Sequence, residues 1–113
     1  RTYLQNNDVR VVFGTIDKPD QEYKDLKAPL KAALEHEQFI TGCINKIYGA
    51  ASDEKDYRTM ECFNWFVKEQ GEEEKNVGDL LKKFKLFDND PKGLYALNQE
   101  LLTRVYAAPT LVL

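Results

Sequence analysis

Histidine, cysteine and methionine are scarce in this chain. It has one histidine (His36), one methionine and two cysteines, Cys43 and Cys62, in 113 residues. The cysteines lie outside any C-x-x-C spacing, which argues against a zinc site and is typical of free thiols in a reducing, cytoplasmic compartment. A Cys43–Cys62 disulfide is geometrically conceivable, but we expect free thiols.

Long hydrophobic runs and an excess of basic residues are also missing. No apolar stretch approaches the roughly 20 residues needed to cross a bilayer, so we expect no membrane association. The net charge is -3 and no basic arm is present, so nucleic acid is not an expected partner. No signal peptide is recognisable, and because the chain begins with Arg1 we expect a processed or truncated N-terminus.

Apolar residues at helical spacing predict an all-α fold in one soluble domain, residues 1–113. Charged residues make up 31% and hydrophobic residues 42%, as in globular proteins. We expect a connection over residues 1–24, long helices over 25–51 and 56–87, and a short helix over 91–107. Local signals support these limits, with aspartates at the expected N-caps and prolines in the first turns and after the last helix.

Each long helix carries an apolar seam that polar residues interrupt. The first seam consists of Leu26, Leu30, Ala33, Ile40, Ile44, Ile47 and Ala51, and its missing member is Glu37. The second consists of Phe63, Phe66, Val77, Leu80 and Phe84, and its gaps fall on Gln70 and Glu73. A carboxylate on the buried stripe of a helix is costly unless something pairs with it, and a metal ion is the obvious candidate.

The three polar gaps are expected at one level of the hairpin. The short polar turn at 52–56 forces the two helices to run antiparallel. Glu37 lies about as many residues before this turn as Gln70 lies after it, and Glu73 is about one turn beyond Gln70. The alternative is a rotated helix that places Glu37 at the edge of the seam, with its carboxylate in water.

A wider acidic surface surrounds these positions. Glu69, Glu72 and Glu73 line one side of the second helix together with Asn76. Oxygen-rich sites suit iron, manganese, magnesium and calcium better than a structural zinc site would. Taken alone, a run of three glutamates is also what an ordinary solvated helix face contains.

Several motifs together resemble a bacterial-type non-haem ferritin. The motif EHEQ at 35–38 is similar to the third bundle helix of this family. EKDY at 54–57 is similar to the following turn, and FNWFVKEQGEEE at 63–74 to the fourth helix. The segment 93–101 is similar to the short fifth helix. The likeness begins at Tyr3-Leu4, the end of the second helix, and continues to about Arg104. The tail after Arg104 does not fit the usual ending of the family.

This resemblance implies a ferritin-like four-helix bundle with a di-iron ferroxidase centre. Glu37 and Glu73 would be iron ligands, and Gln70 would line the centre. Glu69 and Glu72 would help Glu73 to hold a third iron nearby. The family oxidises Fe(II) with oxygen or peroxide and stores Fe(III) as mineral inside a hollow multi-subunit shell.

The resemblance covers only the C-terminal half of such a bundle. The family's first helix and most of its second have no counterpart, and with them go one ligand glutamate and a Glu-x-x-His pair. Because a two-helix hairpin cannot cover its own apolar stripe, we expect either lost upstream sequence or a second chain that completes the bundle. For a dimer without the histidine ligands we predict weaker metal binding and slow or absent ferroxidase turnover.

The sequence is compatible with three alternative functions. The first is ferritin-type iron storage, with half of the ferroxidase site on each chain. The second is a catalytically inactive, truncated ferritin that acts as a self-associating helical dimer or assembly module. The third is a carboxylate bundle for another divalent ion.

Overall fold

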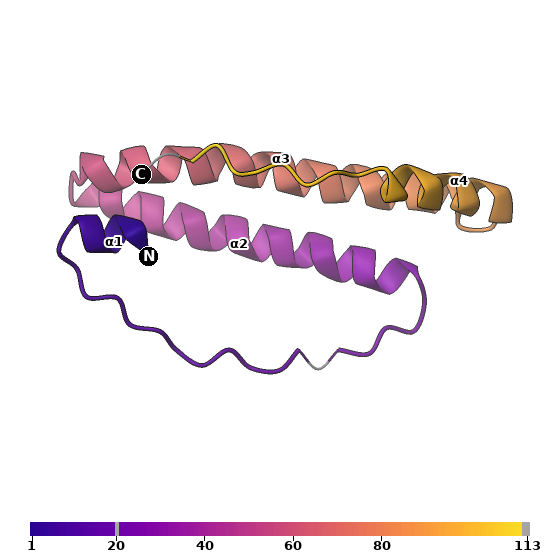
Figure 1. Ribbon diagram of the computed structural model, residues 1–113, viewed down its shortest axis with the longest axis horizontal. Helices are drawn as coiled ribbons and strands as arrows, with labels where there is room; N and C mark the ends of the chain where they lie inside the picture. Colours follow the sequence, from indigo (N-terminus) through magenta and orange to yellow (C-terminus); the bar gives the residue numbers. More distant parts are fainter. Residues whose placement is uncertain (20, 112–113) are drawn as a thin grey trace.

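Two long helices, α2 (Lys27–Asp53) and α3 (Tyr57–Phe87), form an antiparallel hairpin that dominates the structure (Figure 1). The computed structural model describes residues 1–19 and 21–111. No strand occurs in these ranges, and the predicted all-α fold is confirmed. None of the described helices is both long and apolar enough to cross a membrane.

Aspartate side chains accept amide hydrogen bonds at the starts of both long helices, Asp56 as the N-cap of α3 and Asp25 from the position before Leu26, the N-cap of α2. Asp25 Oδ1 accepts hydrogen bonds from the amides of Lys27 at 3.0 Å and Ala28 at 2.8 Å, just before α2. Asp56 Oδ1 accepts from the amide of Thr59 at 3.0 Å, at the start of α3. Each bond satisfies an amide that has no partner inside the helix, which explains where the two helices begin.

The C-terminal helix, α4 (Pro91–Leu102), is shorter than the expected range of 91–107. At its end Thr103 donates its hydroxyl to the carbonyl of Glu100 at 2.7 Å. Val105, expected on the apolar stripe of this helix, lies outside it and is 89% exposed. The expected continuation to residue 107 was wrong, since the chain is irregular after Thr103, where Val105 and Ala107 border an open cavity beside α3 and not a packed surface.

A short helix, α1 (Thr2–Asn6), lies against the start of α3. The hydroxyls of Tyr3 and Thr59 are hydrogen-bonded at 2.8 Å, and Arg58 donates to the side-chain oxygen of Asn7 at 2.8 Å. From there the chain runs toward the far end of the hairpin, with neither helix nor strand in its described residues (Figure 1). The segment expected as a connection, residues 1–24, thus contains a short helix in addition to irregular chain.

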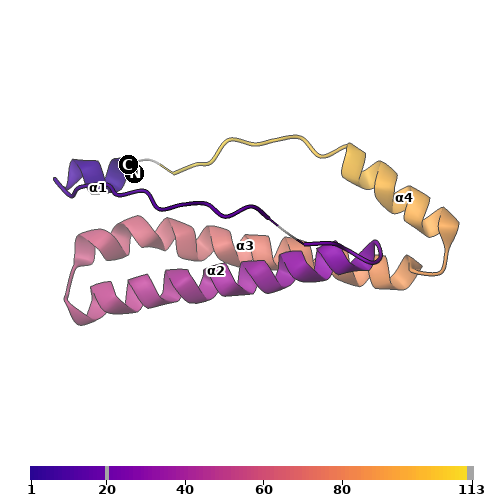
Figure 2. The ribbon, with the colours of Figure 1, turned by 90° about the horizontal axis from the view of Figure 1, so that it is seen from below.

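The apolar core is small for a chain of this length. The buried apolar side chains of the described residues are Ile44, Ala51, Leu81, Phe84 and Leu97. The radius of gyration is 18.1 Å, whereas a compact domain of this length has about 13 Å. Figure 2 shows the hairpin as one layer, with α1, α4 and the two irregular segments on one side of it. Much of the apolar surface of the hairpin is therefore uncovered.

Both cysteines are free thiols, as expected. Cys43 and Cys62 are half-buried on α2 and α3. Burial raises the pKa of the Cys62 thiol, because the charged thiolate loses hydration in an apolar environment. This thiol therefore has less thiolate character than an ordinary exposed one.

Candidate metal centre

Glu37 and Gln70 meet across the hairpin. The side-chain amide of Gln70 donates to Glu37 Oε2 at 2.7 Å and to the Glu37 carbonyl at 3.0 Å. Gln70 is buried, with 9% of its surface exposed, and Glu37 is half-buried. The two side chains therefore lie at one level of the hairpin, and the amide orients the carboxylate through a charge-assisted hydrogen bond.

Glu74, rather than Glu73, extends this contact along the helices. The Thr41 hydroxyl donates to the Glu74 carboxylate, one turn away from the Glu37–Gln70 contact. Residues four apart share a helix face, whereas Glu73 is rotated by about 100° from Glu74. Glu74 was not among the predicted site residues. Its position could have been found from the sequence, because Thr41 lies four residues after Glu37 and Glu74 lies four residues after Gln70, so the two pairs lie on the same helix faces.

Glu73 and Glu69 line a separate cavity beside α3. This cavity has a volume of about 510 Å³, and Asn76 contributes to its polar lining. Its opposite wall belongs to the C-terminal tail, which we define as residues 103–111, and includes Arg104. The structure thus places Glu37 with Gln70 and Glu69 with Glu73. Glu72 is exposed and joins neither pair.

The nearby lysines of α3 do not neutralise these carboxylates. Asp79 pairs with Lys75 at 2.5 Å and with Lys82 at 3.1 Å. The hydrogen bonds from Lys75 and Lys82 lower the pKa of Asp79, and the bond to Asp79 raises the pKa of Lys75. In the described part of the chain, neither Glu69 nor Glu73 forms an ion pair. Both can therefore attract a cation.

The described residues alone do not form a complete metal site. No three His, Cys, Asp or Glu side chains among them lie close enough together to hold a metal ion. The single histidine, His36, is exposed and stacks on Phe39 at a ring-centroid distance of 6.2 Å. What the hairpin presents is a set of hard oxygen donors, which suit iron, manganese, magnesium or calcium.

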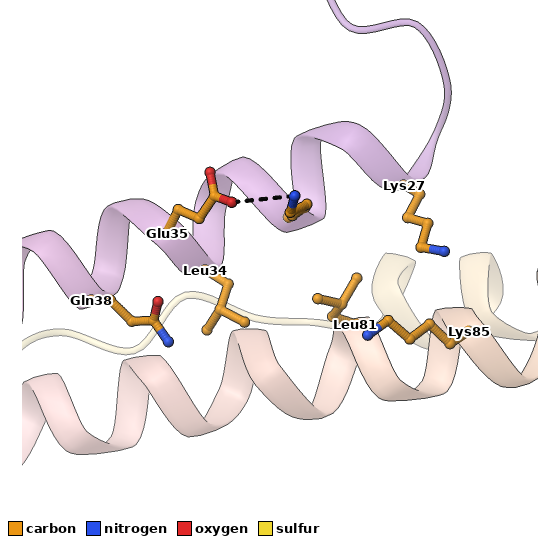
Figure 3. A pocket seen from close by; sticks show the side chains of 7 residues that line it. Lys27, Leu34, Glu35, Gln38, Leu81 and Lys85 are labelled. Carbon is orange, nitrogen blue, oxygen red and sulfur yellow. Dashed lines mark ion pairs between the residues drawn. The ribbon is translucent and has the colours of Figure 1, made fainter.

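Another groove between α2 and α3 is unsuited to a cation. It has a volume of about 400 Å³ and is lined by Lys27, Lys31 and Lys85. Figure 3 shows Leu34 and Leu81 between the two helices in this groove. The three lysines outnumber the one carboxylate of this groove, Glu35, which pairs with Lys31 at 3.5 Å. The groove therefore disfavours a metal cation, and the acidic side of α3 is the better candidate.

Comparison with known sequences places the chain among the ferritins. The family model of the ferritin-like domain matches residues 2–87. A probable bacterial non-heme ferritin-like protein of Haemophilus influenzae is 38% identical over 100 residues, which cover 88% of this chain and 61% of the relative. A bacterial non-heme ferritin of Campylobacter jejuni is 37% identical, with 87% of this chain and 59% of the relative covered.

Solved structures agree with this assignment. An open pore ferritin from Archaeoglobus fulgidus superimposes with a TM-score of 0.88 at 30% identity, covering 92% of this chain and 64% of that structure. A humanized archaeal ferritin gives a TM-score of 0.91 at 31% identity, covering 95% of this chain and 65% of that structure. The chain spans about three fifths of the curated relatives that it matches. It belongs to the ferritin-like family, as its motifs predicted.

Proposed function

We propose that this chain binds iron in a ferritin-type site, where Fe(II) is a substrate that is oxidised and stored as Fe(III). The observation that carries the proposal is the buried amide of Gln70, which holds the carboxylate of Glu37 between the two long helices. A half-buried carboxylate oriented by a buried donor is a pre-organised ligand rather than a mobile surface charge.

Each predicted site residue has a role in this proposal. Glu37 and Glu73 are iron ligands, and Gln70 lines the centre and orients Glu37. Glu69 and Glu72 hold a further iron beside Glu73, on the acidic side of α3. Hard anionic oxygens stabilise Fe(III) relative to Fe(II), and they therefore favour the loss of an electron to oxygen or peroxide.

A complete di-iron centre needs ligands that this chain does not contain. Di-iron bundles take a Glu from each of two helices and a Glu-x-x-His from each of the other two. The chain contains Glu37 on α2 and the segment Gln70-x-x-Glu73 on α3. This segment has the three-residue spacing of Glu-x-x-His but contains no histidine. We propose that the remaining ligands come from a further helix pair, and that a dimer of this chain, which would have no imidazole ligands at the centre, binds metal more weakly and has slow or absent ferroxidase turnover.

Anaerobic Fe(II) binding tests the site. Glu37→Ala and Glu73→Ala are each expected to weaken Fe(II) binding at least severalfold, measured by calorimetry. Glu35→Ala is the matched control, because Glu35 is an exposed glutamate of the same helix and pairs with Lys31 at 3.5 Å. Fe(II) binding that survives both test substitutions unchanged contradicts the proposed site.

A second candidate function is self-association through the uncovered face of the hairpin. Leu26, just before α2, is 72% exposed and Ile47 of α2 is 45% exposed, although both belong to the first apolar seam. A bundle helix that leaves its apolar stripe in water is stabilised when further helices cover it. A second copy of this chain is therefore the proposed partner, with or without bound iron.

A further inference from the structure

The C-terminal tail lies beside the apolar seam of α3. The cavity of about 510 Å³ beside this helix has Val105 and Ala107 of the tail on one side, and Val77 and Leu80 of the seam on the other. Figure 1 shows the tail following the course of α3, and Figure 2 shows it on the same side of the hairpin as α1 and α4. The tail therefore occupies part of the face that further helices would have to cover.

One side-chain hydrogen bond fastens the far part of the tail to α3. The indole nitrogen of Trp65 donates to Thr110 Oγ1 at 3.0 Å. Among the described residues, this is the only hydrogen bond or ion pair between the tail and the two long helices. Loss of this single contact would therefore free the tail from the hairpin.

The tail covers this face poorly. Val105 is 89% exposed and Tyr106 is 84% exposed. Besides the cavity of about 510 Å³, a second one of about 350 Å³ lies where Trp65 and Thr110 meet. Packed interiors, in contrast, have few voids larger than a water molecule. A helix pair that fills both cavities would bury more apolar surface than the tail does.

A second copy of this chain can provide such a helix pair. Four-helix bundles pack helices along their apolar stripes at a small angle, and α2 and α3 already form one antiparallel pair. Two copies related by a twofold axis use the same face of each hairpin, so the surface that needs a cover is also the surface that supplies one. The tail and a second hairpin cannot both lie against Val77 and Leu80.

We propose that the tail is an internal cover of the hairpin face, fastened by the Trp65–Thr110 hydrogen bond, and that a second copy of the chain displaces it to complete the bundle. Each dimer requires the displacement of two tails, so the cover raises the protein concentration at which dimers form. The inference rests on the proposed self-association and adds the device that regulates it.

The first test measures the dimer dissociation constant of the full chain by sedimentation equilibrium. Thr110→Val removes the acceptor of the indole hydrogen bond and is expected to lower this constant about fivefold or more, because two such bonds are lost from the competing monomers. Thr110→Ser keeps a hydroxyl acceptor and should restore the original constant. Thr15→Val is the matched control, since Thr15 is also exposed in an irregular segment and forms no hydrogen bond through its side chain in the described chain.

The second test follows the indole N–H resonance of Trp65 in nuclear magnetic resonance spectra, which is unambiguous because the chain has one tryptophan. In dilute, monomeric samples the resonances of the unmodified protein and of Thr110→Val should differ, because only the former has the acceptor. In concentrated, dimeric samples they should coincide, because both proteins have released their tails. A difference that persists in the dimers contradicts displacement.

The outcomes distinguish the cover from self-association itself. Equal dissociation constants of Thr110→Val and the unmodified protein overturn the cover and leave self-association standing. Weaker association of Thr110→Val also overturns it, since Thr110 would then belong to the interface. Absence of dimers in all of these proteins overturns the cover and self-association together. Tighter association in Thr110→Val alone, with coincident resonances in the dimers, supports the proposal.

Discussion

At the residue scale, the candidate centre depends on the contact between Gln70 and Glu37. Gln70 is the buried polar side chain of the described residues, and its amide reaches both the carboxylate and the carbonyl of Glu37. No buried side-chain nitrogen or oxygen in the described chain lacks a hydrogen-bond partner. The polar interruption of the seam is thus compatible with folding because each group satisfies the other.

Gln70→Leu tests the energetic part of this contact. The substitution keeps a side chain of similar size but removes the amide that donates to the half-buried carboxylate of Glu37 and to its backbone carbonyl. We expect the free energy of unfolding to fall by about 1 kcal/mol, measured by urea denaturation. Gln99→Leu on the exposed surface of α4 is the control, and an equal loss in both variants contradicts the prediction.

The pairing of Glu37 with Gln70 was predictable, and the orientation of Glu73 was not. Counting residues from the turn sets the level of a side chain along a hairpin to within about one turn. Successive residues differ by about 100° around the helix, so the same estimate does not decide whether Glu73 or Glu74 faces α2. The packing of α3 on α2 determines that Glu74, and not Glu73, faces α2.

At the element scale, local signals account for most of the helix limits. Asp25, Asp56 and Asp90 each accept a backbone amide bond at the start of a helix, as their positions predicted. The end of α4 at Leu102 is not marked by such a signal, because the apolar pattern of the sequence continues to Val105. Val105 itself lies outside the helix, is 89% exposed and only borders the open cavity beside α3.

Asp56→Ala tests the cap of α3 and its pH dependence. The hydrogen bonds from Thr59 lower the pKa of Asp56. A lowered folded-state pKa means that this contribution to stability is present above the unfolded-state pKa and is lost as the pH falls through the folded-state pKa. We expect Asp56→Ala to lower the thermal midpoint at pH 7, and the difference to vanish in strong acid.

Asp53→Ala is the control for this cap. Asp53 is an exposed residue at the end of α2, and an acid at a helix C-terminus is not favoured by the helix dipole. Its replacement should leave the midpoint equal or slightly higher at pH 7. A drop as large as that of Asp56→Ala would show that charge alone, and not capping, is responsible.

Gly93→Ala tests the contact between α4 and the end of α3. A Cβ at this position would come within 2.6 Å of Phe87 Cγ and 2.9 Å of Phe87 Cβ. We expect destabilisation of about 1–3 kcal/mol, as for overpacked cores, measured by thermal unfolding. Gly78→Ala is the matched control, because a Cβ there would meet no other part of the described chain within 4 Å apart from its own helix backbone and sequence neighbours. This change should stabilise α3 by about 0.5–1 kcal/mol.

At the scale of the whole molecule, an elongated hairpin has more apolar surface than it buries. The principal extents are 54 × 28 × 25 Å, and no large side chain of the described residues is completely buried. Bundles of this family bury such a surface against two further helices. The stability of the chain is therefore expected to depend on a partner for this face.

Self-association predicts a thermal midpoint that rises with protein concentration, because binding to the folded state adds to its stability. Ile47→Glu places a charge on the uncovered seam of α2 and should abolish this dependence, as measured by calorimetry at several concentrations. Val12→Glu is the control, since Val12 is 77% exposed in the connection and outside the hairpin. A midpoint independent of concentration in the unmodified protein contradicts self-association.

The sequence by itself determined the helices, their antiparallel order, the family and the level at which Glu37 meets Gln70. These properties depend on local spacing, caps and a short turn, which act over a few residues. Only the tertiary structure decided that Glu74 contacts Thr41, that Glu73 shares a cavity with Arg104 and that α4 ends at Leu102. Those outcomes depend on which surfaces are in contact, because the packing of the helices determines which residues a helical side chain can touch.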